Sequence, residues 1–233
     1  MEADKAVPLS DKELRAQQLT NALFAGRVDE ARHSTYAALG RGNTKAEVLD
    51  ALVEAVSIVA DLHEVGEYDQ ARVAATENAV NSCLQVLEDW LAKSQERFGL
   101  KVIIGPVGLR AGSVMSLALS AAMRSAGFPS TSLGKTKTPL EILRNSEELG
   151  ADIVIALLPS DGVQGHVTSF AQEVERGGFK DKFEVILLAP GLPDDFRSPL
   201  AIARNSGEAI TKATEIALKR QPRDEDDDES EDE

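Results

Sequence analysis

Apolar positions recur with the period of a helix through roughly the first hundred residues of the chain. The pattern favours four helices joined by short connections, over about residues 11–24, 28–40, 45–65 and 69–97. The second carries Val28, Ala31 and Tyr36 on one face. The third carries an apolar stripe of helical period: Val48, Leu49, Leu52, Val56, Val59 and Ala60. These helices predict a small bundle over residues 11–98, after an N-terminal tail of residues 1–10.

Local signals mark the ends of these helices. Ser10–Glu13 is typical of a capping box at the first helix, and either Asn43 or Thr44 is expected to cap the third. Gly66 is expected to end the third helix. Cys83 lies on the apolar face of the fourth helix, where we expect a core residue.

The hydrophobic period changes at Gly99. Short apolar runs are expected as strands at residues 101–104, 128–133, 152–158, 184–188 and 200–203, with a glycine-rich turn at residues 105–112. Helices are expected to end near residue 126, to begin at Thr138-Pro139, and to cover about residues 163–176 and 207–219. This alternation predicts a doubly wound, five-stranded parallel sheet of flavodoxin-like order over residues 100–220. The fold class is therefore a helical bundle followed by an α/β domain.

Composition agrees with such a core and narrows the setting. Hydrophobic residues make up 42% of the chain but aromatic residues only 4%, so Ala, Leu, Val and Ile must fill the interior. A single cysteine excludes an internal disulfide and fits a reducing compartment. We see neither a signal peptide nor an apolar run of membrane-spanning length, so the expected location is the cytoplasm.

Charge is unevenly distributed along the chain. The net charge is −14, and residues 221–233 carry nine acidic residues against one arginine. A block of like charges without apolar residues is expected to be a disordered acidic tail, acting either as a solubilising brush or as a docking segment for a basic partner. The rest of the chain has no basic stripe, which disfavours direct binding of nucleic acid.

Ligands of a doubly wound sheet bind at the carboxyl ends of its strands, here the loops at residues 105–112, 158–165 and 189–195. The first loop is glycine-rich but is neither a G-x-G-x-x-G motif nor a P-loop. Its glycines either permit a tight turn or let a ligand approach the backbone. Arg110 is either an anion-binding residue at a helix start or a solvated surface charge.

Several segments match one known kind of module in order and in spacing. They are Asp61–Tyr68, Val73–Asn78, the interval from Gly105 to Gly127-Phe128, and Asn205–Ala209. Over about residues 15–220 the chain resembles the cobalamin-binding modules of methionine synthase, corrinoid methyl-carrier proteins and B12-dependent regulators. The resemblance implies a four-helix cap before a five-stranded Rossmann-like domain, with a corrinoid between them.

The cobalt-binding signature of these modules is missing. The family's D-x-H-x-x-G motif falls on Arg110, Gly112 and Met115, and glycine has no donor atom for a metal. In the photoreceptor branch a Glu-His pair faces the corrin; Glu77 matches, but Asn78 stands in place of the histidine. The resemblance implies a degenerate cofactor-binding site made of eight residues: Gly105, Gly108, Arg110, Gly112, Ser160, Gly191, Glu77 and Asn78.

Two histidines are weak candidates for a metal. A relative of this fold binds haem instead of cobalamin, which makes His63 or His166 conceivable axial ligands. Both equally fit surface or capped histidines, and Tyr68 and Trp90 fit packing residues.

Three functions follow from these observations. One is a non-catalytic regulatory, sensor or interaction module with a degenerate corrinoid site and a protein partner, with or without bound cobalamin. The second is a corrinoid methyl carrier serving a separate methyltransferase, and the third is a haem-binding sensor. No catalytic dyad, metal cluster or activated nucleophile is evident, so we expect no enzyme beyond a carrier subunit.

Overall fold

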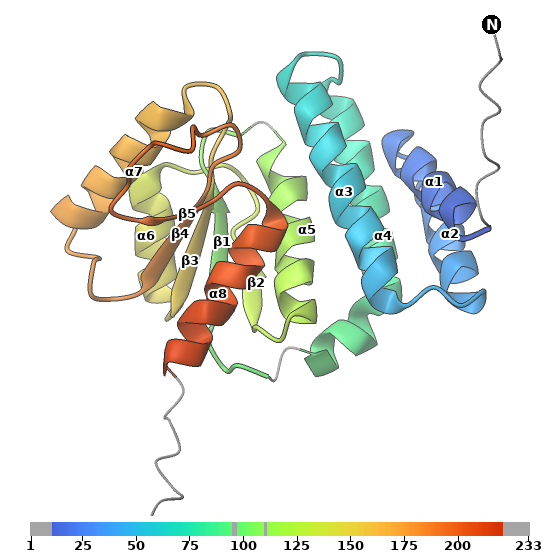
Figure 1. The fold of residues 1–233 in the computed structure, drawn as a ribbon. Helices are drawn as coiled ribbons and strands as arrows, with labels where there is room; N and C mark the ends of the chain where they lie inside the picture. Colours follow the sequence, from blue (N-terminus) through green and yellow to red (C-terminus); the bar gives the residue numbers. More distant parts are fainter. Residues whose placement is uncertain (1–10, 95–96, 110, 221–233) are drawn as a thin grey trace, which may run out of the picture.

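A computed structural model describes residues 11–94, 97–109 and 111–220 of the chain (Figure 1). Four helices come first: α1 (Asp11–Phe24), α2 (Val28–Gly40), α3 (Lys45–Glu64) and α4 (Gln70–Ser94). They pack side by side as the expected bundle. The predicted capping box at Ser10 and the two predicted tails lie outside the described residues.

Helix α3 begins at a capping box and buries the predicted stripe. The Thr44 hydroxyl accepts a hydrogen bond from the Glu47 backbone N–H at 3.2 Å, and the Glu47 carboxylate accepts one from the Thr44 N–H at 2.9 Å. Thr44, rather than Asn43, is therefore the cap. Every residue of the stripe is buried: Val48, Leu49, Leu52, Val56, Val59 and Ala60.

The face expected for α2 was wrong at Tyr36. Its side chain is 53% exposed, whereas Ala31, Thr35 and Ala38 are buried. These three small residues recur at the spacing of one helix face and let α2 approach α4 closely, which a tyrosine would prevent. The buried Thr35 hydroxyl is satisfied by donating to the Ala31 carbonyl at 2.9 Å.

The second half of the chain is the predicted parallel sheet. Its strands are β1 (Val102–Pro106), β2 (Ser130–Ser132), β3 (Ile153–Leu157), β4 (Glu184–Leu188) and β5 (Ala201–Ala203). Their order is β2-β1-β3-β4-β5 and every pairing is parallel, which confirms the flavodoxin-like order.

Helices cover both faces of this sheet (Figure 1). They are α5 (Gly112–Ser125), α6 (Pro139–Glu148), α7 (Val163–Arg176) and α8 (Ser206–Arg220). Helices α5 and α8 share a core with one face, and α6 and α7 share a core with the other. The fold class is thus an α/β domain after a helical bundle. A boundary between domains at residues 98–100 stays a prediction.

Helix α5 belongs to both cores. Leu119 and Met123 pack on the sheet, whereas Val114, Ala118 and Ala121 join the hydrophobic core of the bundle. Small side chains on that outer face let α3 and α4 lie directly against α5. The bundle therefore packs against the sheet domain through α5, one of the helices that cover the sheet.

Candidate functional site

The carboxyl edge of the sheet holds several of the predicted site residues. Ser160 follows β3 and is exposed, and Gly191 follows β4. Gly108 follows β1, and both glycines are exposed in the left-handed region, at φ +67° for Gly108 and +73° for Gly191. Their turns require glycine, whatever else the loops do. Arg110 lies outside the described residues.

Gly105 and Gly112 serve close packing. Strand β1 continues through Pro106, so Gly105 lies inside the strand and the turn begins two residues later than expected. A Cβ atom on Gly105 would lie 2.8 Å from Cγ1 of Ile142 on α6. A Cβ atom on Gly112, the first residue of α5, would lie 2.4 Å from Cβ of Pro106. Neither position has room for a side chain unless Ile142 or Pro106 moves.

Glu77 and Asn78 lie on α4 but in different surroundings. The Glu77 carboxylate accepts a hydrogen bond from the Ser113 hydroxyl on α5 at 2.8 Å. Asn78 is exposed to solvent. Glu77 thus connects the bundle to the first turn of α5, within one residue of Gly112.

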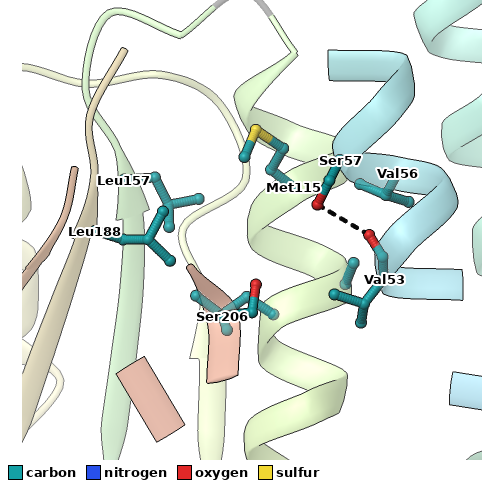
Figure 2. Close-up of a pocket in the computed structure, with 9 residues that line it drawn as sticks. Val53, Val56, Ser57, Met115, Leu157, Leu188 and Ser206 are labelled. Carbon is teal, nitrogen blue, oxygen red and sulfur yellow. Dashed lines mark hydrogen bonds between the residues drawn. The ribbon is translucent and has the colours of Figure 1, made fainter. Parts of the chain in front are cut away.

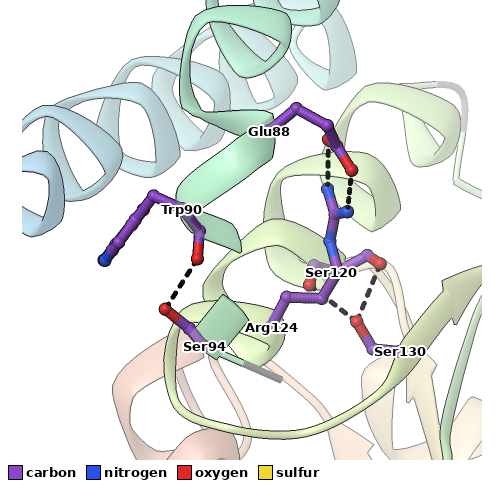
Figure 3. Close-up of polar contacts among 6 residues, drawn as sticks. All are labelled: Glu88, Trp90, Ser94, Ser120, Arg124 and Ser130. Atoms are coloured by element: carbon purple, nitrogen blue, oxygen red, sulfur yellow. Dashed lines mark hydrogen bonds and ion pairs between the residues drawn. The ribbon is translucent and has the colours of Figure 1, made fainter. Parts of the chain in front are cut away.

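A second polar link joins the same two helices further along. The Arg124 guanidinium donates to both carboxylate oxygens of Glu88, at 2.8 and 3.3 Å (Figure 3). Figure 3 also shows Ser120 of α5 bonded to Ser130 of β2, at 2.9 Å between the two hydroxyl oxygens. Helix α5 is therefore tied by side chains both to the bundle and to the edge strand.

The two candidate histidines lie on elements that do not meet. His63 is 5% exposed at the end of α3, and its Nδ1 is hydrogen-bonded to the Tyr68 carbonyl, while its Nε2 is buried without a partner among the described residues. His166 is half-buried on α7, which covers the opposite face of the sheet from α5. Within the described ranges, no three His, Cys, Asp or Glu side chains cluster as a metal site would require.

The described residues do not fit a corrinoid held by a histidine at position 112, the ligand position that the resemblance implies. Position 112 has neither a donor atom nor room for one, because Pro106 fills that space. Cys83, a possible alternative thiolate, is buried in the bundle core. Burial raises the pKa of its thiol, and a hydrogen bond with the Thr35 side chain offsets only part of that rise.

A groove lies between α3, α5 and the start of α8, between the bundle and the sheet domain, where the resemblance implies a ligand. None of the predicted site residues that the structure describes lines it. It has a volume of about 420 Å³. Its deep end is a narrow pocket of about 10 Å³ against the last residues of β3 and β4, Leu157 and Leu188 (Figure 2). Met115 and Ser57 line both parts, and the Ser57 hydroxyl is satisfied by the Val53 carbonyl at 3.0 Å. The deep end is too small for a cofactor, whereas the outer groove has the size of a ligand site.

The two walls of this groove differ in charge. Helix α3 contributes three carboxylates, Asp50, Glu54 and Asp61. The opposite wall is the start of α8, where Asn205 caps the helix by accepting from the Glu208 N–H at 2.9 Å. Arg204 lies there and pairs with Asp194 at 2.6 Å. The sequence signal for this wall is the spacing of its acids, which recur after four and seven residues and so lie on one face of α3.

Comparison with known proteins shows the fold. No protein-family model and no curated protein sequence matches the chain. Among solved structures, the Methanosarcina barkeri monomethylamine corrinoid protein is similar, with a TM-score of 0.64 at 16% identity, over 88% of this chain and 99% of that one. This chain therefore has the fold of a corrinoid protein, a helical bundle followed by a Rossmann-like domain.

Two further structures are similar at lower scores. One is the methanol:cobalamin methyltransferase complex of Methanosarcina barkeri, with a TM-score of 0.43 at 15% identity, over 92% of this chain and 86% of that one. The other is a cobalamin-binding protein of Desulfitobacterium hafniense DCB-2, with a TM-score of 0.43 at 14% identity, over 89% and 98%. In the part of this chain that the structure describes, no helix combines the length and apolarity needed to cross a bilayer.

Proposed function

We propose that this protein is a non-catalytic interaction or sensor module, built on the corrinoid-protein fold, working without a bound corrinoid and acting through a protein partner. The observation that carries the proposal is the packing of Gly112 against Pro106. A Cβ atom on Gly112 would lie only 2.4 Å from the Cβ atom of Pro106. A ligating histidine at that position is sterically incompatible with the present turn. The fold is then retained without the group that the resemblance assigns to cobalt.

The residue at position 112 favours this module over a methyl carrier. The resemblance implies that carriers use the lower histidine to tune cobalt, and Gly112 supplies no donor. A haem sensor needs an axial ligand with an open face, whereas the imidazole of His63 is buried and bonded to the Tyr68 carbonyl. Both alternatives remain measurable, because corrinoids and haem absorb visible light strongly.

The test is cofactor retention by the full chain. The purified protein is incubated with hydroxocobalamin, and separately with haemin, and then passed through gel filtration with detection at protein and cofactor wavelengths. We expect the cofactor absorbance to elute with the free compounds. Co-elution of about one corrinoid per chain would contradict the proposal and favour the carrier, and co-elution of haem would favour the haem sensor. Far-UV circular dichroism of the same fractions verifies that the protein is folded.

A further inference from the structure

The acidic wall of the groove is a row of three carboxylates. Asp50, Glu54 and Asp61 are exposed, and they are four and seven residues apart on α3. They lie along one side of the helix over about 16 Å, at 1.5 Å per residue. Within the described residues, none of these carboxylates has an ion pair or hydrogen bond. Their charge is therefore available to a binding partner.

The groove beside this row is apolar. Its floor and sides include Val53, Met115, Leu188, Pro190 and Ile210. Covering such a floor with an apolar side chain is favourable, because it removes apolar surface from water.

The same side of α3 and its C-cap, Val65, also expose apolar residues beyond the groove. Ile58 is 38% exposed and Val65 is 70% exposed, a large fraction for aliphatic side chains. With Glu54 and Asp61 they recur at intervals of four, three and four residues, the spacing of a single helix face. Acidic and apolar side chains thus alternate along one surface of α3, as they do on surfaces that bind amphipathic segments.

The opposite wall does not balance this charge. Among the described residues that line the groove, Arg204 is the basic one, and its guanidinium is already paired with the Asp194 carboxylate. The groove therefore attracts cations toward α3 and apolar groups toward its floor.

We propose that this groove docks a segment of a protein partner that is basic on one face and apolar on the other. The lysine or arginine side chains lie along Asp50, Glu54 and Asp61, and the apolar side chains cover Met115 and its neighbours. Charge complementarity selects a basic occupant, and the length of the acidic row corresponds to about three turns of a bound helix. This inference rests on the proposed function as an interaction module and specifies which surface the partner contacts.

Methionine methyl groups provide a direct probe of the groove. The chain has three methionines: Met115 lines the groove, Met123 is fully buried against the sheet, and Met1 lies outside the described residues. The full chain is labelled with ¹³C at the methionine methyl groups and titrated with a synthetic helix-forming peptide of leucine and lysine, about 14 residues long. We expect the Met115 resonance to shift saturably and the Met123 resonance to stay in place. A peptide with glutamate in place of lysine is expected to have no effect.

Two matched triple variants then test the acidic row. Asp50→Asn/Glu54→Gln/Asp61→Asn removes the three carboxylates of the groove, and we expect about a tenfold loss of affinity for the basic peptide. The control, Glu148→Gln/Glu175→Gln/Asp181→Asn, removes the same number of charges from exposed positions at or beyond the C-terminal ends of α6 and α7. We expect it to change the affinity by less than about twofold, because its positions are on the other side of the sheet.

Three results would overturn the inference. They are an unmoved Met115 resonance, equal losses in the two triple variants, or a Met115 shift that follows protein concentration without peptide, which would make the groove an interface between copies. None of these depends on cofactor retention. A failed peptide titration with no retained cofactor therefore overturns only the docking surface, whereas retained cobalamin overturns the proposed function.

Discussion

The Glu77 carboxylate and the Ser113 hydroxyl join α4 to α5 at a distance of 2.8 Å. Glu88 and Arg124 make the second link, and each pair is separated by 36 residues in the sequence. A constant offset means that the two helices run parallel and in register over three turns. The bundle is thus held on α5 at both ends by side chains, around a seam of small apolar residues.

Breaking the Glu88–Arg124 pair is expected to weaken the packing of the bundle on α5. Arg124 has a side chain only 19% exposed, so Glu88→Gln leaves a guanidinium poorly solvated and unpaired. We expect the free energy of unfolding in urea to fall by about 1 kcal/mol, at the upper end for a partly exposed pair. Glu175→Gln, at an exposed position on α7, is the control and is expected to be neutral. Equal stability of the two variants would show that the pair contributes nothing.

Gly105 is expected to reject even a methyl group. An added Cβ would lie 2.8–3.1 Å from three side-chain carbons of Ile142, so Gly105→Ala should cost about 1–3 kcal/mol in urea denaturation. In the Ile142→Ala background the loss of stability caused by Gly105→Ala should be smaller, because the three side-chain carbons of Ile142 are absent. A cost that is unchanged by Ile142→Ala would mean that something other than this contact requires glycine.

Gly165 provides the opposite expectation. It lies within α7, no described atom outside its own stretch of helix lies within 4 Å of the position that a Cβ atom would take, and its φ is in the ordinary range. Gly165→Ala should therefore stabilise the protein by about 0.5–1 kcal/mol, through the helix propensity of alanine. A loss of stability in the same urea titration would contradict the packing at this helix.

Cys83 is expected to be inert in the folded protein. Since burial raises the pKa of its thiol, little thiolate is present near neutral pH, and reaction with a thiol reagent should be much slower than in urea. A raised pKa in the folded state also has a consequence for stability. The protonated Cys83 thiol contributes fully to the free energy of unfolding below the unfolded pKa of about 8.5. This contribution is lost as the pH rises through the folded pKa. The free energy of unfolding of Cys83→Ser should therefore fall less at alkaline pH than that of the parent chain. An equal fall in the two proteins would contradict this expectation.

Glu141 is expected to make α6 sensitive to acid. Hydrogen bonds from the backbone N–H and the hydroxyl of Thr138 lower the pKa of its carboxyl, and the charge of Lys137 adds to this. A lowered folded pKa gives stability that is present above the unfolded value of about 4.3 and is lost as the pH falls through the folded pKa. Glu141→Gln should lose less stability over that acid range than the parent chain, and an identical acid profile would argue against this capping box.

The fold was predictable because its signals are local. The Thr138-Pro139 start of α6, the helix at residues 163–176 and the strand at residues 184–188 all follow from caps and periodicity, and the structure confirms them. Tyr36 was misplaced because the choice of helix face depends on how closely a neighbouring helix packs. That is a property of the assembled bundle rather than of the segment.

The candidate site was harder to predict because distant segments build it. Asp61 of α3 and Arg204 before α8 are far apart in the sequence, and only the seating of the bundle on α5 brings their walls around one groove. Resemblance directed attention to Gly105 and Gly112, whose packing against Ile142 and Pro106 is not visible in a spacing pattern. The missing histidine, by contrast, was readable directly from the sequence.

Position 112 is tested most directly by the free energy of unfolding of Gly112→Ala, measured in urea in the parent chain and in Pro106→Gly. The 2.4 Å approach to Pro106 predicts a loss of about 1–3 kcal/mol in the parent and a clearly smaller loss when the proline is absent. With an open position, alanine at the start of α5 would instead match or exceed glycine in stability. A Gly112→Ala variant as stable as the parent chain would therefore contradict the closed packing at position 112, which is the observation on which the proposed function rests.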